Sequence, residues 1–173
     1  MYPGEIRKLV ERLDKPYVMI LIGPPLSGKT TFLNTVLIPD TFRHISTDNL
    51  VLELDKVGDG DYDRAWKEAD WKFIKKYVKD QMRECNEASE NTVIDFTNLR
   101  GKRRRSNLGF FSKKFYKIAV IFPILEDDEY DIRNKSRFIA EKKSIKKNLM
   151  KELIDSTQPI DPKLEKYDKI IRL

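Results

Sequence analysis

The sequence predicts an α/β fold in which helices cover a mainly parallel sheet. Short apolar runs rich in β-branched residues alternate along the chain with longer stretches whose apolar residues recur at helical spacing. That alternation is typical of βαβ units and a three-layer arrangement. No linker, repeat or Pro/Gly-rich tract divides the 173 residues, so residues 1–173 are expected to form a single domain.

Five strands are expected. The first, residues 17–22 (YVMILI), is short, apolar and bounded by Gly23, which is typical of a buried strand. The others are expected at residues 42–46, 92–96 (TVIDF), 117–122 (KIAVIF) and 169–173 (KIIRL). The last of these would close the edge of the sheet.

Helices are expected between the strands, at residues 29–37, 62–85, 103–115, 127–138 and 144–155. The second is the longest, and its apolar residues follow a helical period. These are Trp66, Ala69, Phe73, Ile74, Tyr77, Val78 and Met82. We expect them to be core residues and not a surface on which nucleic-acid bases stack.

Composition excludes several classes of protein. No run of about 18 apolar residues is present, as a membrane span would require, and the charged N-terminal segment lacks the apolar centre of a signal peptide. The single cysteine, Cys85, cannot form an internal disulfide, which fits a reducing cytoplasm. A cysteine nucleophile would need a histidine partner, and His44, the only histidine, is not favoured in that role.

Positive charge is concentrated in two stretches of a chain whose net charge is +6. Residues 100–117 contain eight lysine or arginine residues and no acid, and residues 133–151 contain eight more against a single Glu141. Among the charged residues of 48–70, in contrast, acids dominate. Clustered cations favour a polyanionic partner, although a lysine-rich solvated surface explains the charge equally well.

The most specific motif is a phosphate-binding loop. Residues 23–30 (GPPLSGKT) fit G-x-x-x-x-G-K-[ST], with a buried strand before the motif and a helix after it. The loop would cradle the phosphates of ATP with its backbone N–H groups, which Pro24 and Pro25 lack. The residues expected to bind the nucleotide are Gly23, Pro24, Pro25, Leu26, Ser27, Gly28, Lys29, Thr30 and the following Thr31. Lys29 would reach the β- and γ-phosphates, and the Thr30 hydroxyl would bind Mg²⁺.

A GTPase-like switch is the alternative use of such a loop. Residues 55–58 (DKVG) superficially fit D-x-x-G but follow an acidic stretch without a clear sheet strand. Residues 134–137 (NKSR) begin like the guanine-reading N-K-x-D motif, yet Arg137 stands where the aspartate is needed. Nothing would then pair with the edge of the guanine ring, so the switch is disfavoured.

Asp48 is the candidate general base. It follows the second expected strand (HISTD), in the crevice at the carboxyl end of the sheet where α/β proteins bind ligands. There it could accept the proton of a hydroxyl group that attacks phosphorus. The structural alternative is that Asp48 caps a helix beginning at Asn49.

The third expected strand also ends in polar residues. Asp95 would touch Mg²⁺ through water or orient its neighbours, and Thr97 and Asn98 are plausible contacts of the acceptor. Taken alone, these two residues serve equally well as a turn and a helix cap. Later in the chain, Arg133 and Arg137 are four residues apart and share one helical face. They would stabilise the charge of the transferring phosphoryl group from a lid, with a solvated surface as the alternative.

Together these segments resemble the kinase domain of the polynucleotide 5′-hydroxyl kinases, from about residue 17 to residue 171. The resemblance rests on GPPLSGKTT, on STD after the second strand, on VIDFTNL followed by arginines, and on RNKSR in the lid. It implies a sheet of order 2-3-1-4-5 and a helical lid. It also implies Asp48 as general base, Lys29 and Thr30 on ATP–Mg²⁺, and Arg137 as the lid arginine with Arg133 nearby.

One position departs from that family. Its members tend to carry an arginine three residues after the general base, where it grips the acceptor's phosphate, and this chain has Val51 there. Either another residue binds the acceptor, namely Arg100 or a member of the cluster Arg103, Arg104 and Arg105, or the acceptor is a different one. Because three consecutive helical residues fan around the axis, only one or two of that cluster could face the site.

The sequence therefore predicts an ATP-dependent kinase for a hydroxyl of a nucleic acid, most simply the 5′-OH end of DNA or RNA. Zeta-toxin-like and metabolite kinases share the predicted architecture, so a nucleoside or another small alcohol is an alternative acceptor. The hydroxymethyl group of a modified base is a further alternative, in a phage protein acting in its host. A nucleotide-dependent binding module without transfer chemistry is the alternative from another class.

Overall fold

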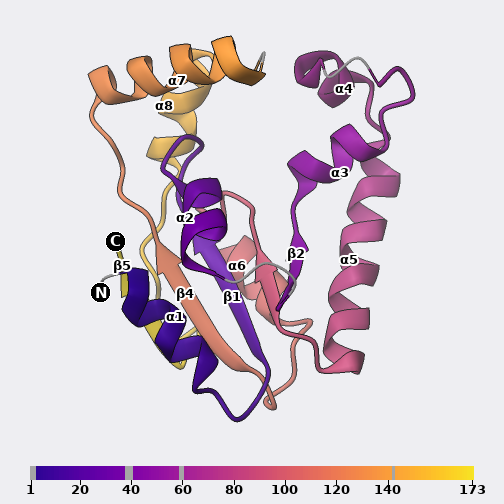
Figure 1. Cartoon of the computed structure of the whole chain (residues 1–173), viewed down its shortest axis with the longest axis vertical. Coiled ribbons are helices and arrows are strands. Elements are labelled where there is room, and N and C mark those ends of the chain that lie inside the picture. The colour runs from indigo at the N-terminus through magenta and orange to yellow at the C-terminus, as the bar shows by residue number, and fades with distance from the viewer. Residues whose placement is uncertain (1–2, 38–40, 59–60, 142) are drawn as a thin grey trace.

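The computed structural model describes residues 3–37, 41–58, 61–141 and 143–173. Five strands form one sheet: β1 (Tyr17–Ile22), β2 (Arg43–Ile45), β3 (Thr92–Ile94), β4 (Tyr116–Ile121) and β5 (Lys169–Arg172). Their order is β2-β3-β1-β4-β5, and the neighbouring strands pair in parallel (Figure 1). The structure thus confirms the α/β class and the strand order 2-3-1-4-5.

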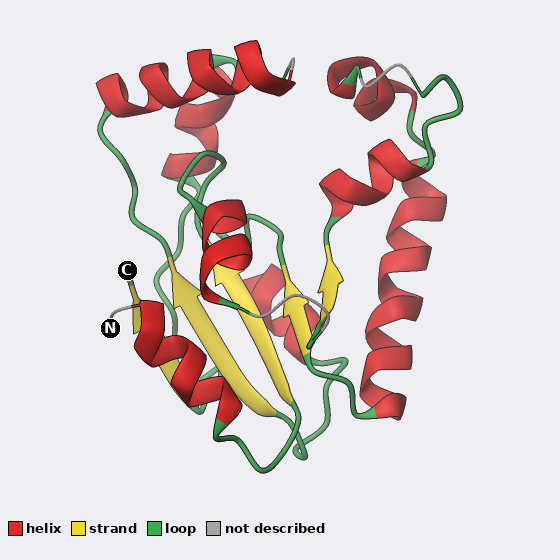
Figure 2. Cartoon of the chain, viewed as in Figure 1, coloured by secondary structure: helices red, strands yellow, loops and turns green. Residues whose placement is uncertain are grey.

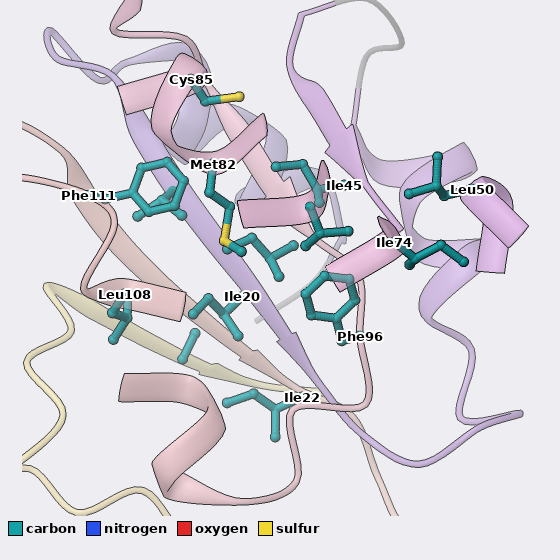
Figure 3. Close-up of a cluster of buried hydrophobic side chains, with 14 of the residues drawn as sticks. Ile20, Ile22, Ile45, Leu50, Ile74, Met82, Cys85, Phe96, Leu108 and Phe111 are labelled. Carbon is teal, nitrogen blue, oxygen red and sulfur yellow. The ribbon is translucent and has the colours of Figure 1, made fainter. Parts of the chain in front are cut away.

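Helices cover both faces of the sheet (Figure 2). Side chains alternate along β1 because successive residues of a strand point to opposite faces. Tyr17, Met19 and Leu21 join the cluster that packs against α1 (Pro3–Glu11) and α2 (Lys29–Val36). The intervening residues of β1 join the opposite cluster, shown in Figure 3, which packs against helices α3 to α6.

The expected helix at residues 62–85 is two helices, α4 (Tyr62–Glu68) and α5 (Trp71–Ala88). The break occurs because the Asp70 carboxylate accepts hydrogen bonds from the backbone N–H groups of Lys72 and Phe73 and so starts a new helix. Ala69 is extended at the junction. The helical pattern of the sequence therefore continued across a capped boundary.

The prediction that the aromatic residues of this region are core is also wrong. Ile74, Val78 and Met82 form the buried stripe of α5. Trp66, Phe73 and Tyr77 are instead 38%, 47% and 42% exposed. Phe73 and Tyr77 directly precede residues of the stripe, so their side chains leave the helix at a different angle. Trp66 lies on α4, beyond the break.

The remaining helices are α3 (Thr47–Glu53), α6 (Gly101–Leu108), α7 (Asp127–Glu141) and α8 (Lys147–Asp155). α6 ends seven residues before the expected end at residue 115, because tight turns follow it and bring Phe111 and Phe115 into the core. α8 begins at Lys147 and not at residue 144. The Asn134 side chain bonds both backbone groups of Ile145, which holds that segment out of the helix.

The helices surround the carboxyl ends of the strands. In Figure 1, α7 and α8 lie above the half of the sheet that contains β4, and α3 and α4 lie above the half that contains β2. In the same view, the segment between β1 and α2 lies below α7. None of the described helices is long and apolar enough to cross a membrane.

Candidate functional site

The loop between β1 and α2 has a backbone shaped by close packing. A Cβ atom on Gly23 would lie 2.7 Å from Ser27 Oγ and 2.8 Å from Phe122 Cβ, so only glycine fits there. Leu26 and Gly28 adopt positive φ angles of 64° and 98°. Gly28 is the N-cap of α2 and supplies no side chain to cap it. The first N–H groups of this helix are therefore placed to meet an anion.

Lys29 lies inside this loop. Its Nζ donates hydrogen bonds to the carbonyl oxygens of Gly23 (3.0 Å) and Pro24 (2.7 Å). Burial lowers the pKa of Lys29 to about 8, while the negative charges of Asp95 and Asp48 oppose that shift and the positive charge of Arg137 adds to it. The structure thus brings the predicted phosphate lysine, both predicted carboxylates and the lid arginine within electrostatic reach of one another.

The loop fits a polyphosphate. Ser27 Oγ is buried and has no hydrogen-bond partner among the residues that the structure describes. A phosphate oxygen would satisfy this hydroxyl and the open N–H groups of α2 together. Both features belong to the same short segment as Lys29.

Magnesium would be held jointly with the phosphates. Within the described part of the chain, no three His, Cys, Asp or Glu side chains gather in a way that could hold a metal ion. Mg²⁺ usually takes one or two protein ligands and completes its shell with water and substrate phosphates. Thr30, which is exposed at the start of α2, and Asp95 remain the predicted contacts.

Asp48 is not a helix cap. Helix α3 begins at Thr47, and its N-cap is Ser46, whose Oγ accepts a hydrogen bond from the Asn49 N–H at 3.4 Å. The structural alternative for Asp48 is therefore wrong. The Asp48 carboxylate instead accepts a hydrogen bond from the Tyr62 hydroxyl. Burial, followed by the charge of Asp48, raises the pKa of Tyr62, so this hydroxyl stays protonated and donates.

Asp95 lies just beyond β3, where its backbone N–H donates to the Ile45 carbonyl oxygen of the neighbouring strand. Its carboxylate is 3.2 Å from His44 Nε2, and the side chain is only 11% exposed. The next polar residue, Thr97, accepts a hydrogen bond through its carbonyl oxygen from the Gly23 N–H at 3.0 Å. This bond joins the phosphate loop to the end of the third strand.

The lid arginines approach the phosphate loop from α7. Arg133 donates through Nη1 to the Leu26 carbonyl oxygen at 2.9 Å and through Nη2 to Glu129 Oε1 at 2.6 Å. Arg137 lies one turn later. Its positive charge adds to the lowering of the Lys29 pKa and opposes the raising of the Tyr62 pKa. Arg133 and Arg137 therefore share the helical face that looks onto the loop.

Arg104 does not face an acceptor. Its side chain is fully buried and forms an ion pair with Glu165, with Nε–Oε2 and Nη2–Oε1 distances of 2.6 and 2.8 Å. Nη1 also donates to the carbonyl oxygens of Asn98 and Leu99. Arg104 is a structural residue, which corrects its assignment to acceptor binding.

Asn98 is structural for a similar reason. Its side chain is buried and donates to the Leu21 carbonyl oxygen at 2.8 Å, while its Oδ1 accepts a hydrogen bond from Asn107 at 3.0 Å. Of the other predicted acceptor contacts, Arg103 lies over the Phe96 ring at 5.3 Å from its centroid. Arg103 borders the cavity described below and Arg105 does not, as the fanning of consecutive residues predicts.

The site opens into one large cavity of about 2120 Å³. The phosphate loop, the two lid arginines, Asp48, Arg100 and Arg103 all line it. Ligand pockets usually occupy about 300–1,000 Å³, so this space has room for a nucleotide and a second substrate.

Sequence reasoning missed three aromatic residues that line the cavity: Tyr62, Trp66 and Trp71. Their dense spacing in YDRAWKEADW was the available signal. We assigned the period of this segment to the core without separating the two helices.

The motif that resembled a GTPase switch has a structural role. Asp55 follows α3 and not a strand, and its carboxylate accepts hydrogen bonds from the backbone N–H groups of Val57 and Gly58. It also pairs with Arg64 of α4. Asp55 thus fastens the connection between α3 and α4, outside the cavity lining.

Comparison with known proteins places the chain among P-loop proteins. The family model AAA_33, described as an AAA domain, matches residues 18–159. No curated protein matches. Solved structures with the same fold include a chain of the Pnkp1/Rnl/Hen1 RNA repair complex, with a TM-score of 0.61 and 18% identity, and the match covers 85% of this chain and 46% of that one.

Two further structures extend the range of functions found on this fold. Kti12 from Chaetomium thermophilum, in complex with ADP-AlF3, has a TM-score of 0.56 and 13% identity, with 90% of this chain and 88% of that chain covered. A gluconokinase from Sinorhizobium meliloti 1021 has a TM-score of 0.51 and 12% identity, with 91% and 82% covered. At these identities the likeness concerns the fold alone.

Proposed function

The chain belongs to the AAA domain family AAA_33, and from this premise we propose that it is an ATP-dependent kinase that phosphorylates a hydroxyl of a nucleic acid, most simply the 5′-OH end of DNA or RNA. One observation carries the proposal: Asp48 and Lys29 line the same cavity, and the charge of Asp48 partly opposes the lowering of the Lys29 pKa by burial. A carboxylate able to accept a proton thus lies beside the cation that would hold the phosphates.

The chemistry follows from these positions. ATP supplies the γ-phosphoryl group, and Mg²⁺ bound with Thr30 and Asp95 would neutralise phosphate charge. The acceptor oxygen forms a bond to the γ-phosphorus, the bond from that phosphorus to the bridging oxygen breaks, and ADP leaves with the electron pair. Asp48 takes the proton of the acceptor hydroxyl. Lys29, Arg133 and Arg137 stabilise the charge on the transferring group.

Three observations support a nucleic-acid acceptor. Arg100, Lys102 and Arg103 border the cavity, where they could hold acceptor phosphates. The cavity is larger than a nucleotide pocket needs to be. One protein with the same fold belongs to an RNA repair complex.

A small alcohol is the second candidate acceptor, and a fold shared with a gluconokinase favours it. It would leave the basic border of the cavity without a use. Phosphorylation of a base hydroxymethyl group would use the same Asp48 chemistry as phosphorylation of a 5′-OH end. These two acceptors differ only in the part of the nucleic acid that enters the cavity with the hydroxyl.

The test is transfer of radiolabelled γ-phosphate from ATP to four acceptors: 5′-OH DNA, 5′-OH RNA, duplex DNA with hydroxymethylated bases, and nucleosides or gluconate. We expect label on an oligonucleotide end. Asp48→Asn should lower kcat by about 10²–10⁴-fold through loss of the general base, with ATP binding unchanged. Label on the small alcohols alone would refute the nucleic-acid acceptor, and an unaltered kcat for Asp48→Asn would refute the mechanism.

A further inference from the structure

We infer that Tyr62, Trp66 and Trp71 form a subsite that stacks an unpaired base of the acceptor, with the Tyr62 hydroxyl holding Asp48 in position. The inference rests on the proposed kinase function and deepens it, because it identifies what the acceptor presents besides a hydroxyl. We call these three residues the aromatic subsite.

The three rings pack against one another in turn, at interplanar angles of 37° (Tyr62–Trp66) and 64° (Trp66–Trp71). The ring centroids of Tyr62 and Trp66 are 5.5 Å apart, and those of Trp66 and Trp71 are 4.3 Å apart. The indole N–H of Trp71 donates to the Trp66 carbonyl oxygen at 3.2 Å, which ties α5 to α4. All three residues line the same cavity as Asp48.

The aromatic subsite is open to solvent on one side. Trp66 is 38% exposed although tryptophan is highly buried on average. Its neighbour along the helix, Ala65, is buried in the core, which fixes α4 with Trp66 facing outward. An exposed indole in the cavity lining fits a flat ligand with a π face, and a nucleic-acid base is such a ligand.

Cations lie where the acceptor's backbone would run. Lys143 Nζ is 4.6 Å from the centroid of the Tyr62 ring. Lys75, one helical turn after Trp71, also borders the cavity. Alternating rings and cations are the pattern by which proteins hold single strands, whereas a sugar acid or a small alcohol offers no ring to stack.

Tyr62 links the aromatic subsite to the chemistry. Its ring contacts Trp66, and its hydroxyl donates to the Asp48 carboxylate. A base that stacks here therefore places its own sugar close to the residue that would accept the proton. Tyr62 is a positioning residue in this arrangement, because it acts through Asp48.

Val51 explains why such a subsite is needed. This residue stands where the polynucleotide kinases tend to have a phosphate-gripping arginine, and here it is buried in the core. The aromatic subsite lines the cavity together with Asp48 and would supply another hold for the acceptor.

Intrinsic fluorescence tests the inference without any transfer. The chain contains two tryptophans, and both belong to the aromatic subsite, so quenching reports on this place alone. The ligands are a 5′-OH trinucleotide and the same trinucleotide with an abasic 5′ residue, each added with a non-transferable ATP analogue. We expect quenching by the first and little by the second. Equal quenching by both, or by neither, would overturn the stacking.

Kinetics supply the matched comparison. Trp66→Ala should raise KM for the base-bearing acceptor about tenfold or more and leave KM for the abasic one unchanged, while Trp66→Phe restores most of the loss. Phe73→Ala is the control, because Phe73 is an equally exposed aromatic residue outside the cavity lining. An equal rise in KM for both acceptors would overturn the inference.

The Tyr62 role has its own readout. Tyr62→Phe keeps the ring, so it should lower kcat about tenfold or more while KM and fluorescence quenching stay as in the wild type. An unchanged kcat would show that the hydroxyl does not position Asp48. If the base-bearing trinucleotide quenches the fluorescence of the wild type but receives no phosphate from it, the proposed function is refuted and the aromatic subsite is supported. If it receives phosphate without quenching the fluorescence, the proposed function is supported and the aromatic subsite is refuted.

Discussion

The two halves of the site are built in different ways. The half predicted to hold the nucleotide comes mainly from one continuous segment, in which Gly23, Ser27 and Lys29 contact one another within a single loop. The half predicted to hold the acceptor comes from separate segments, with Asp48 on α3, Tyr62 and Trp66 on α4, and the arginines on α6. Only tertiary packing brings those segments together.

The difference shows what each half depends on. In the nucleotide half, backbone N–H groups and a helix terminus would bind the phosphates, so the properties of this half follow from a local motif. In the acceptor half, side chains would contact the acceptor, and their positions depend on contacts between segments that are distant in the sequence. Specificity for the acceptor is accordingly the part that the fold leaves open, as the varied proteins with this fold illustrate.

Within the nucleotide half, the largest expected effect comes from Lys29. Lys29→Ala should lower kcat about 10²–10³-fold, because a preorganised donor to the phosphates is lost. Acceptor binding should not change, and neither should the fold, since the Lys29 side chain bonds its own loop and no other part of the described residues. Steady-state kinetics with circular dichroism checks this, and normal turnover in a folded variant would disprove the role of the lysine.

The next effect concerns the buried ion pair between Arg104 and Glu165, which lies behind the cavity wall of the acceptor half. Arg104→Ala leaves Glu165 buried and unpaired, so the free energy of unfolding should fall by about 3–5 kcal/mol. The carbonyl oxygens of Asn98 and Leu99, in the cavity wall, lose a donor as well. Urea denaturation measures the change. Arg105→Ala is the control: Arg105 is exposed, and a change within about 0.5 kcal/mol is expected.

A pH titration should separate the two halves. The pKa of Lys29 is lowered to about 8, so the free protein carries this charge below that pH and loses it above. Triphosphate charge is nearly constant above about pH 7. ATP affinity should therefore stay level up to about pH 8 and then fall, by about tenfold per pH unit at most.

Binding of a fluorescent ATP analogue between pH 6.5 and 9.5 measures this fall. Lys29→Arg keeps its charge throughout that range and should flatten the curve. Fluorescence quenching by the base-bearing trinucleotide alone should show no such decline. A parallel decline in both would mean that the two halves do not titrate independently.

The smallest effect concerns salt. Arg103→Ala should reduce the slope of log KM for a 5′-OH oligonucleotide against log salt concentration by about one unit, as expected for one lost phosphate contact. ATP affinity should barely move. Arg105→Ala should leave the slope unchanged, because Arg105 lies outside the cavity lining. Equal slopes for all three proteins would remove Arg103 from the acceptor half.

The fold was largely predictable because its signals are local. The run YVMILI and the loop after it predicted β1 to the residue, and the remaining strands lie within three residues of their expected ends. The break between α4 and α5 was not predicted, since the Asp70 cap lies inside an uninterrupted apolar period. Periodicity describes which residues face the same way only while the helix is continuous.

The site was predictable to a different degree in each half. The sequence indicated Lys29 and Asp48 because motif and strand end coincide. It did not indicate that Arg104 would be buried, because its partner Glu165 is 61 residues away. Tyr62 was missed for the same reason, since its bond to Asp48 depends on how α4 packs against α3.

The burial of Val51 also constrains how this protein could change over evolutionary time. It is 2% exposed and packs in the same cluster as Leu50, Ala65 and Ile74. A mutation to arginine at this position would place an unpaired cation in that cluster, at a cost of several kcal/mol. A single substitution to arginine would therefore destabilise the fold unless α3 repacked against α4 and α5.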